Sequence, residues 1–391
     1  MNNSYFRRAG FRTIYWSTAV LIIFCVSIFF SFIQEKPLYT PEEFTKLIRD
    51  FSEPGGYFQS DNWVSNETSI LEVLDPLKEN GIKGGVYIGV GPEQNFTYIT
   101  AVKPEIAFIV DIRQQNRMQH LYYKVLFEIA ETRADFLSLL LCKPLDPKQD
   151  KMLKQNHNID SLVTYFYLTP PDPKLQDKTR QKVLEILEKK YMFQLSPSEQ
   201  SELNYVVDAF YQFNINITYN TYNMNITNIN FPNRSGNRGS MRSPTLGALL
   251  CLQAPDGSQR NPFNSDEDYA YLRKMNRENR IIPITGNFGG TKALASIAQY
   301  LSDKKMTVSA MYVSNVEQYL FRNYLDWNQW TANVKALPIT AKSVFIRYTR
   351  DSSGFSGTQQ VRLQWIKTFI KNCDEGRYLS YSDLTRLDYI K

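Results

Sequence analysis

The chain has 391 residues, enough for one large or two ordinary domains, and its apolar fraction of 43% and aromatic fraction of 14% are typical of a folded protein. Much of its formal charge of +6 comes from Arg7, Arg8 and Arg12, and the near-neutral remainder excludes the strongly basic surface of most nucleic-acid-binding proteins. With two histidines, four scattered cysteines and no CxxC pair, the sequence indicates neither a zinc site nor a disulfide framework, so we expect no metal.

Residues 14–33 contain no charged side chain and, as a helix, would reach about 30 Å, the thickness of the hydrocarbon core. Three arginines precede this run, whereas Glu35 and Lys36 nearly cancel after it. The positive-inside rule therefore predicts a signal anchor, with residues 1–36 as cytoplasmic tail and transmembrane helix. Residues 37–391 would then form a domain on the periplasmic side of a bacterial inner membrane. A cleaved signal peptide and a buried core helix are the alternatives.

Alternating apolar runs and amphipathic segments indicate an α/β domain. Residues 85–90 and 106–110 are predicted to be buried strands, and a glycine turn and a helix from about Asn95 follow the first of them. Wholly apolar strands are typical of parallel sheets that are covered on both faces. Their alternation with helices predicts a right-handed βαβ unit. Further strands are expected at 281–285, 307–313 and 343–348, and further helices at 114–130, 266–279, 291–302 and 315–322.

Two other parts of the chain complete the predicted organisation. Thr40-Pro41-Glu42-Glu43 is typical of a helix start, and Ser65 or Asn66 is expected to cap a second helix. Residues 132–212 are predicted to be mostly helical, and residues 214–242, rich in Asn, Thr and Tyr, are predicted to form a long loop. The expected fold is a doubly wound, mainly parallel Rossmann-like sheet with a helical insertion, preceded by one transmembrane helix.

The segment from Gly89 to Asn95, GVGPEQN, is the strongest candidate for a ligand site. Gly89 would permit a tight turn, Gly91 would let a ligand approach the backbone, and the following helix would offer unpaired N–H groups. Asp111, at the end of the next strand, is placed to accept hydrogen bonds from ribose hydroxyls. The third glycine of the dinucleotide motif is replaced by Gln94. The alternative is a simple tight turn with Asp111 as a helix cap.

Two later loops leave predicted strands at the same sheet edge. In TGNFGGT, Asn287 and Phe288 are placed for amide and ring contacts with a ligand, and Thr291 is the expected helix N-cap. In VSNVEQ, Asn315 is expected to cap a short helix whose first turn contains Glu317. The Glu317 carboxylate could instead act as a general base or bind an amine. An ordinary glycine-rich connection and simple capping are the alternatives for these loops.

Three blocks together resemble an uncharacterised bacterial family with a fold like that of S-adenosylmethionine-dependent methyltransferases. They are GVYIGVGPEQNFTYITAVKPEIAFIVDIR, ITGNFGGTKALASIAQYL and VSAMYVSNVEQYLF, and the resemblance covers about residues 57–350. Asn287 stands where that family usually has an aspartate, so a role in acid or base chemistry does not carry over to this position. The resemblance implies a pocket formed by Gly89, Gly91, Gln94, Asn95 and Asp111, with Arg113, Asn287 and residues 315–318 as further members.

The resemblance implies a nucleotide-type pocket but no established reaction. Because the fold is like that of methyltransferases, S-adenosylmethionine as the ligand and methyl transfer as the reaction are the first hypothesis. The predicted topology opposes this, because S-adenosylmethionine is a cytoplasmic metabolite and the domain is expected outside the cytoplasm. The alternative is a non-catalytic periplasmic domain that binds another small nucleoside-like ligand, or a scaffold on the same fold. In all three cases we expect the membrane, contacted through residues 14–33, as a partner, and no nucleic acid.

Overall fold

The computed structural model describes residues 38–155, 158–220, 243–350 and 359–390. The predicted transmembrane helix at 14–33 and most of the predicted loop at 214–242 lie outside these residues. Within the part of the chain that is described, no helix is both long and apolar enough to cross a membrane.

Six strands form a sheet in the order β3-β2-β1-β4-β5-β6. The first five are parallel to one another, and β6 pairs antiparallel with β5 at one edge. The predicted α/β class and mainly parallel sheet are therefore confirmed, whereas β6, beyond the last predicted strand, was not predicted. The strands are β1 (Val86–Gly89), β2 (Ile106–Asp111), β3 (Ile281–Thr285), β4 (Val308–Ser314), β5 (Ile339–Arg350) and β6 (Gln359–Trp365).

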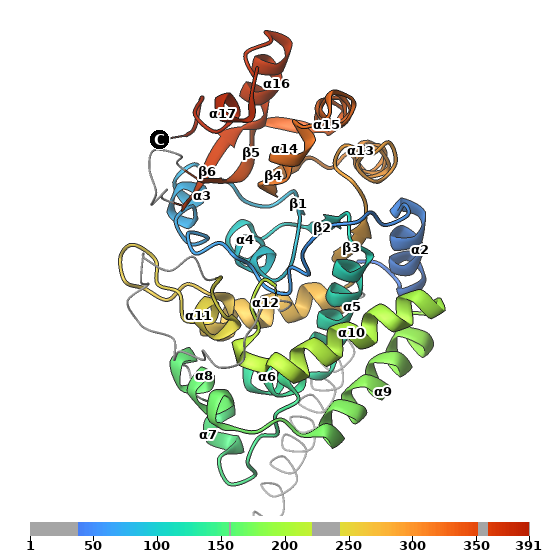
Figure 1. Cartoon of the computed structure of the whole chain (residues 1–391), viewed down its shortest axis with the longest axis vertical. Coiled ribbons are helices and arrows are strands. Elements are labelled where there is room, and N and C mark those ends of the chain that lie inside the picture. The colour runs from blue at the N-terminus through green and yellow to red at the C-terminus, as the bar shows by residue number, and fades with distance from the viewer. Residues whose placement is uncertain (1–37, 156–157, 221–242, 351–358, 391) are drawn as a thin grey trace, which may run out of the picture. The chain divides into compact units, whose positions relative to one another are not determined.

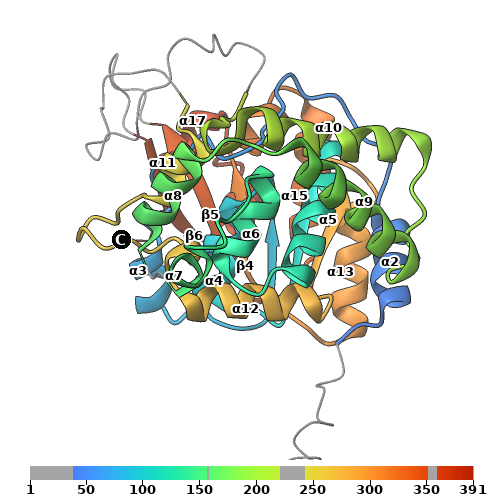
Figure 2. The same ribbon diagram turned by 90° about the horizontal axis from the view of Figure 1, so that it is seen from below.

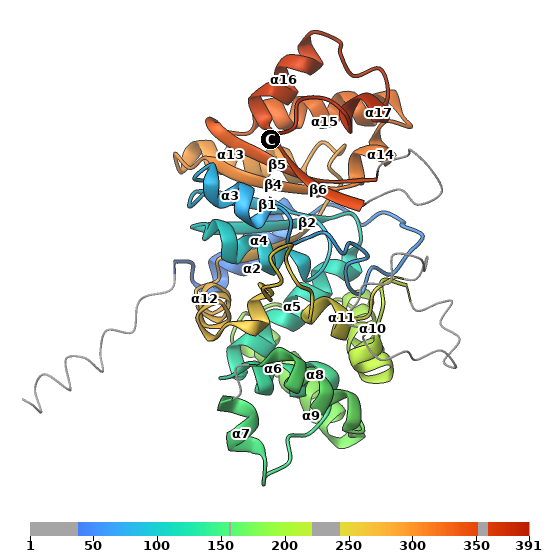
Figure 3. The same ribbon diagram turned by 90° about the vertical axis from the view of Figure 1, so that its left-hand side faces the viewer.

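Helices cover both faces of the sheet (Figures 1 and 3). On one face, α4 packs on β1 and β4, α5 packs on β2 and β3, and α12 lies outside α4 and α5. On the other face, α16 packs on β5, and α15 lies between α13 and α16. Every residue of β1, β2 and β3 is buried, as expected for strands covered on both sides. These helices are α4 (Gln94–Val102), α5 (Gln114–Ile129), α12 (Asp266–Arg277), α13 (Ala293–Asp303), α15 (Tyr324–Ala336) and α16 (Ile366–Asp374).

A further group of helices, inserted between α5 and β3, lies below the sheet in Figure 1 and in front of it in Figure 2, which is the view from below. One of its two longest members, α10, packs along α5, and the five-residue α11 packs against α8 and the short helix η1. Residues 132–212, predicted to be mostly helical, contribute most of this group. Its members are α6 (Arg133–Leu141), α7 (Asp150–Gln155), α8 (Ile159–Leu168), α9 (Pro173–Lys189), α10 (Pro197–Phe213), η1 (Asn214–Asn216), α11 (Leu246–Leu250) and η2 (Pro262–Asn264).

The first residues of the helices show which of the predicted caps are present. At α2 (Pro41–Phe51) the predicted capping box is present, because Thr40 accepts from the Glu43 N–H and the Glu43 carboxylate accepts from the Thr40 N–H. The second predicted helix is present as α3 (Leu74–Glu79), but its predicted start is wrong: α3 begins at Leu74, and Ser65 instead donates its backbone N–H to Glu93 at the sheet edge.

Two further caps were predicted, at Thr291 and Asn315. Helix α13 begins at Ala293 after Lys292, so Thr291 is not its N-cap. In α14 (Val316–Leu320), Asn315 occupies the N-cap position, but its side chain makes no capping hydrogen bond. In the turn before α13, Lys292 donates from Nζ to the Ser52 carbonyl, 2.5 Å away, so a contact with a distant residue holds this turn in place of a cap.

Candidate functional site

Strand order reverses between β1 and β4, and ligands of doubly wound sheets bind outside the carboxyl ends of strands at such a switch point. The glycine loop follows β1, Asp111 ends β2, and Asn287 follows β3. Asn315 follows β4, and because these four strands are parallel neighbours their carboxyl ends share one edge. The structure thus brings the predicted loops to the same edge of the sheet.

The glycine loop is held closed by Asn95, a fully buried residue. Its Nδ2 donates to the carbonyls of Val90, Gly91 and Pro92 at 3.0, 3.1 and 2.7 Å. Its Oδ1 accepts from the Tyr87 hydroxyl at 2.8 Å. The Asn95 side chain therefore shapes the loop and has little capacity left for a ligand.

Gly91 has the positive φ of +80° that favours glycine, and its carbonyl lies 2.9 Å from Nε2 of buried His120. Burial lowers the pKa of His120 to about 4, so the ring is neutral at physiological pH. Because the partner is a carbonyl, Nε2 carries the proton and donates it. This hydrogen bond from His120 therefore connects α5 to the glycine loop and holds the loop in place.

We expect Gly89→Ala to lower the free energy of unfolding by about 1–3 kcal/mol through overpacking. A Cβ at Gly89 would lie 1.9 Å from Asn95 Oδ1 and 2.7 Å from Tyr87 Cε1, and Asn95 cannot move away without losing its four hydrogen bonds. Urea denaturation of the full-length chain measures the change. Gly55→Ala, where a Cβ would meet its nearest atoms at 3.4 Å, is the matched control. Equal stability of the two variants would contradict this account of the loop.

Asp111 and Arg113, both buried, form an ion pair at the end of β2. The Asp111 carboxylate accepts from the backbone N–H, Nε and Nη2 of Arg113 at 2.9, 3.0 and 2.7 Å. A carboxylate has about four lone-pair positions, so one remains for a further donor. Arg113 also donates to the Asp61 carbonyl. The pair is therefore rigid before any ligand arrives.

Residues 52–67, called the edge segment below, cross the carboxyl edge of the sheet. The position of this segment could not be predicted from the sequence, because the segment has no periodic pattern. Its partners follow the sheet order and so extend across the switch point. Ser52 and Glu53 form hydrogen bonds with Thr285 and Asn287 at the end of β3, and Gly56 and Asp61 with Ile112 and Arg113 after β2. Ser65 bonds to Glu93 of the glycine loop, and Glu67 bonds to Tyr312 and Ser314 of β4.

Glu67, the last residue of the edge segment, is a buried carboxylate that the sequence did not reveal as a site residue. Its Oε1 accepts from the hydroxyls of Tyr312 and Ser314 at 2.7 and 2.6 Å. Burial raises the pKa of Glu67 to about 7, although these two hydrogen bonds oppose the shift. Gln94 joins the cluster, since its Nε2 lies 3.3 Å from the Tyr312 hydroxyl oxygen.

Two buried acceptor oxygens around the switch point, Glu67 Oε2 and Gln94 Oε1, have no hydrogen-bond partner within the described residues. The same holds for the hydroxyl of Tyr98, whose ring packs against that of Tyr312. A buried polar atom that lacks a partner costs about 1–3 kcal/mol, and native proteins contain few of them. Glu67 Oε2 is an acceptor while its carboxyl group is ionised, and Gln94 Oε1 is an acceptor at any pH. The group that complements this region is therefore a hydrogen-bond donor or a cation.

Asn287 and Phe288 serve the structure around β3. The Asn287 side-chain oxygen Oδ1 accepts from the Gly289 N–H at 2.9 Å, and the backbone N–H of Asn287 donates to Glu53 Oε1 at 2.6 Å. The buried Phe288 ring is stacked on Trp330, with ring centroids 5.3 Å apart. Both side chains thus support the loop from within the chain, and their predicted ligand contacts remain predictions.

Glu317 forms a buried ion pair with Arg347 of β5. Nε and Nη2 of Arg347 donate to the two carboxylate oxygens at 2.6 and 2.9 Å, and Trp330 Nε1 donates to Oε1 at 3.1 Å. The Arg347 guanidinium also donates to Gln364 of β6. Glu317 therefore joins α14 to β5 and α15, a role that neither the capping nor the general-base interpretation included.

Comparison with known protein families gives one match, described as a domain of unknown function (DUF7790), over residues 62–161 and 253–373. Together these ranges cover more than half of the chain, and they include Glu67, the glycine loop, Asp111 and all six strands. The interruption falls within the inserted helices. No curated protein matches the chain. Within the described residues, no group of three or more His, Cys, Asp or Glu side chains is arranged to hold a metal ion.

Proposed function

The chain belongs to the DUF7790 family, and we propose that its α/β domain binds a small nucleoside-type ligand at the β1–β4 switch point, with S-adenosylmethionine as the first candidate. The observation that carries this proposal is the pair of buried acceptor oxygens at the end of β4, Glu67 Oε2 and Gln94 Oε1. The strand order supports it, because it is that of doubly wound nucleotide-binding sheets apart from the antiparallel β6.

The residues at the edge fit such a ligand by their chemistry. Asp111 has an acceptor position left for a ribose hydroxyl, and Gln94 Oε1 can accept from a further donor. The Glu67 carboxylate would pair with a cationic group, which would restore its charged form in a buried place. S-adenosylmethionine offers hydroxyl donors, an ammonium group and a sulfonium charge, and when bound it would supply an electrophilic methyl group.

A non-catalytic ligand-binding or scaffold domain is the second candidate. It is favoured by the internal hydrogen bonds of Asn95 and Asp111 and by the edge segment that crosses the switch point. The proposed periplasmic location also favours it, since S-adenosylmethionine is a cytoplasmic metabolite. A phosphatase fusion at Lys391 tests that location, and phosphatase activity would argue against methyl transfer in the cell.

We expect S-adenosylhomocysteine to bind the full-length chain and to raise its Tm, and we expect Glu67→Gln and Asp111→Asn each to weaken binding at least about tenfold. Both changes keep side-chain size and remove the charge that the ligand would meet. Calorimetric titration of each variant, after its melting curve has shown that it is folded, measures the effect.

Glu375→Gln, a change at an exposed residue at the end of α16, should bind like the unaltered chain. Folded protein that gives no heat with S-adenosylhomocysteine or S-adenosylmethionine would rule out the first candidate. Binding that is unchanged in both site variants would place the ligand elsewhere.

A further inference from the structure

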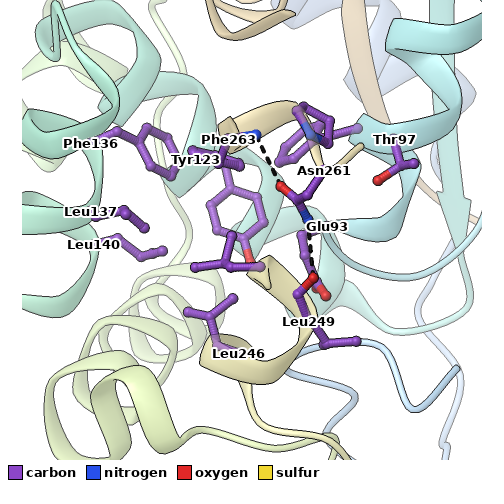
Figure 4. A pocket seen from close by; sticks show the side chains of 13 residues that line it. Glu93, Thr97, Tyr123, Phe136, Leu137, Leu140, Leu246, Leu249, Asn261 and Phe263 are labelled. Atoms are coloured by element: carbon purple, nitrogen blue, oxygen red, sulfur yellow. Dashed lines mark hydrogen bonds between the residues drawn. The ribbon is translucent and has the colours of Figure 1, made fainter. Parts of the chain in front are cut away.

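A narrow apolar pocket lies beside the glycine loop, on the side of α4 that faces the inserted helices (Figure 4). Its walls come from α4, α5, α6, α11 and η2, and most of its lining is aromatic or aliphatic. Phe96, Tyr123, Phe136 and Phe263 supply the aromatic side chains. Glu93, the residue before α4, contributes the carboxylate of the lining, which also contains the polar side chains of Thr97 and Asn261.

One oxygen of Glu93 is unpartnered. Oε1 accepts from the Ser65 N–H of the edge segment at 3.0 Å, whereas Oε2 is buried and has no hydrogen-bond partner among the residues described. Nor does any lysine, arginine or histidine of the described ranges form an ion pair with Glu93. Burial raises the pKa of Glu93 to about 7, because only backbone N–H groups oppose the desolvation of its charge.

Two of the other polar side chains of the lining, Asn261 and Tyr123, already have partners within the chain. Asn261 Oδ1 accepts from the Phe263 N–H at 2.9 Å, and its Nδ2 donates to the Leu249 carbonyl at 3.3 Å (Figure 4). The Tyr123 hydroxyl oxygen accepts from Gln119 Nε2 at 2.7 Å. These bonds fix the walls of the pocket and leave Glu93 Oε2 as its open acceptor.

We propose that this pocket binds a small primary amine with an aromatic or branched apolar body. The ammonium group would donate to Glu93 Oε2 and supply the positive charge that the buried carboxylate lacks. The apolar body would lie against the aromatic and leucine side chains of the walls. The lining does not include Glu67 or Asp111, so this site does not depend on the nucleoside site proposed above.

The pocket must widen to admit such a ligand, because its cavity volume of about 20 Å³ has room for roughly one water molecule. One short wall element is α11, which contributes Leu246, Leu249 and Leu250. The first turn of α11 is held by the Thr245 side chain, which accepts from the Ala248 N–H at 3.2 Å. Shortening a leucine of α11 should therefore make room for the ligand and strengthen binding.

The probes are 2-phenylethylamine and the uncharged 2-phenylethanol, titrated into the full-length chain at about pH 8, where a carboxyl with the pKa of Glu93 is ionised. We expect the amine to bind at least about tenfold more tightly than the alcohol. Glu93→Gln keeps an acceptor for the Ser65 N–H and should abolish this preference. Leu249→Ala should increase the affinity for both probes, and Glu67→Gln should leave the preference intact.

Three results would overturn the proposal. They are equal binding of the two probes, an unchanged preference in folded Glu93→Gln, and no amine binding to either the unaltered chain or Leu249→Ala. The nucleoside site is tested separately, because S-adenosylhomocysteine binding should not change in Glu93→Gln if the pocket is a distinct site. Loss of both ligands in that variant would instead make the pocket part of the nucleoside site.

Discussion

Replacing Arg347 by methionine is expected to lower the free energy of unfolding by about 3–5 kcal/mol. The change leaves Glu317 buried, with 1% of its side chain exposed and without the guanidinium that neutralises its charge. It also removes the contact of Arg347 with Gln364, which connects β5 to β6. Urea denaturation of the full-length chain, followed by circular dichroism, measures the loss.

Two further variants identify the cause of this loss. Glu317→Leu combined with Arg347→Met removes both charges and should recover most of the stability, because the cost comes from an uncompensated buried charge. Lys335→Met breaks the exposed pair with Asp374 and should cost at most about 1 kcal/mol. If the single Arg347 variant were no less stable than the Lys335 variant, Glu317 would not depend on its partner.

Glu67→Gln is expected to become more stable than the unaltered chain as the pH rises. The pKa of Glu67 is raised from 4.5 to about 7, so the stability that its protonated form contributes is present below pH 4.5 and is lost as the pH rises through 7. The neutral amide does not titrate and still accepts from Tyr312 and Ser314. The stability difference in favour of the variant should therefore grow by about 3 kcal/mol between pH 4.5 and pH 7.5.

The measurement is the difference between the two chains at each pH, which cancels the contributions of groups that titrate equally in both. His120 and Lys124 are two such groups, because burial shifts the pKa of each without contact with Glu67. Glu375→Gln, at an exposed position, should give a difference that does not change over this range. A flat difference for Glu67→Gln would mean that Glu67 is not desolvated in the folded domain.

The local sequence determined the first half of the α/β domain. The apolar runs of β1 and β2, the stripe of α5 and the caps of α2 are formed by near neighbours in the chain, so periodicity and capping predicted them. Parallel pairing then followed from their alternation, and it placed Gly89, Asp111 and Asn287 at one edge. The sequence assigned the tight turn to Gly89, whereas the structure shows that the positive φ occurs at Gly91.

Tertiary structure alone decided what those residues contact. Glu67 lies far from Ser314 in the chain, and no local pattern shows that the edge segment brings its carboxylate to the end of β4. Likewise, the sequence alone places Glu317 as an anion in the first turn of a helix, whereas in the structure it pairs with Arg347 of β5. Asn95 is a candidate ligand contact in the sequence, whereas in the structure its four hydrogen bonds hold the glycine loop. Burial and pairing of polar side chains depend on distant segments meeting. For this reason the sequence located the edge at which the site is proposed, and the folded chain decided which of its polar atoms are left without partners.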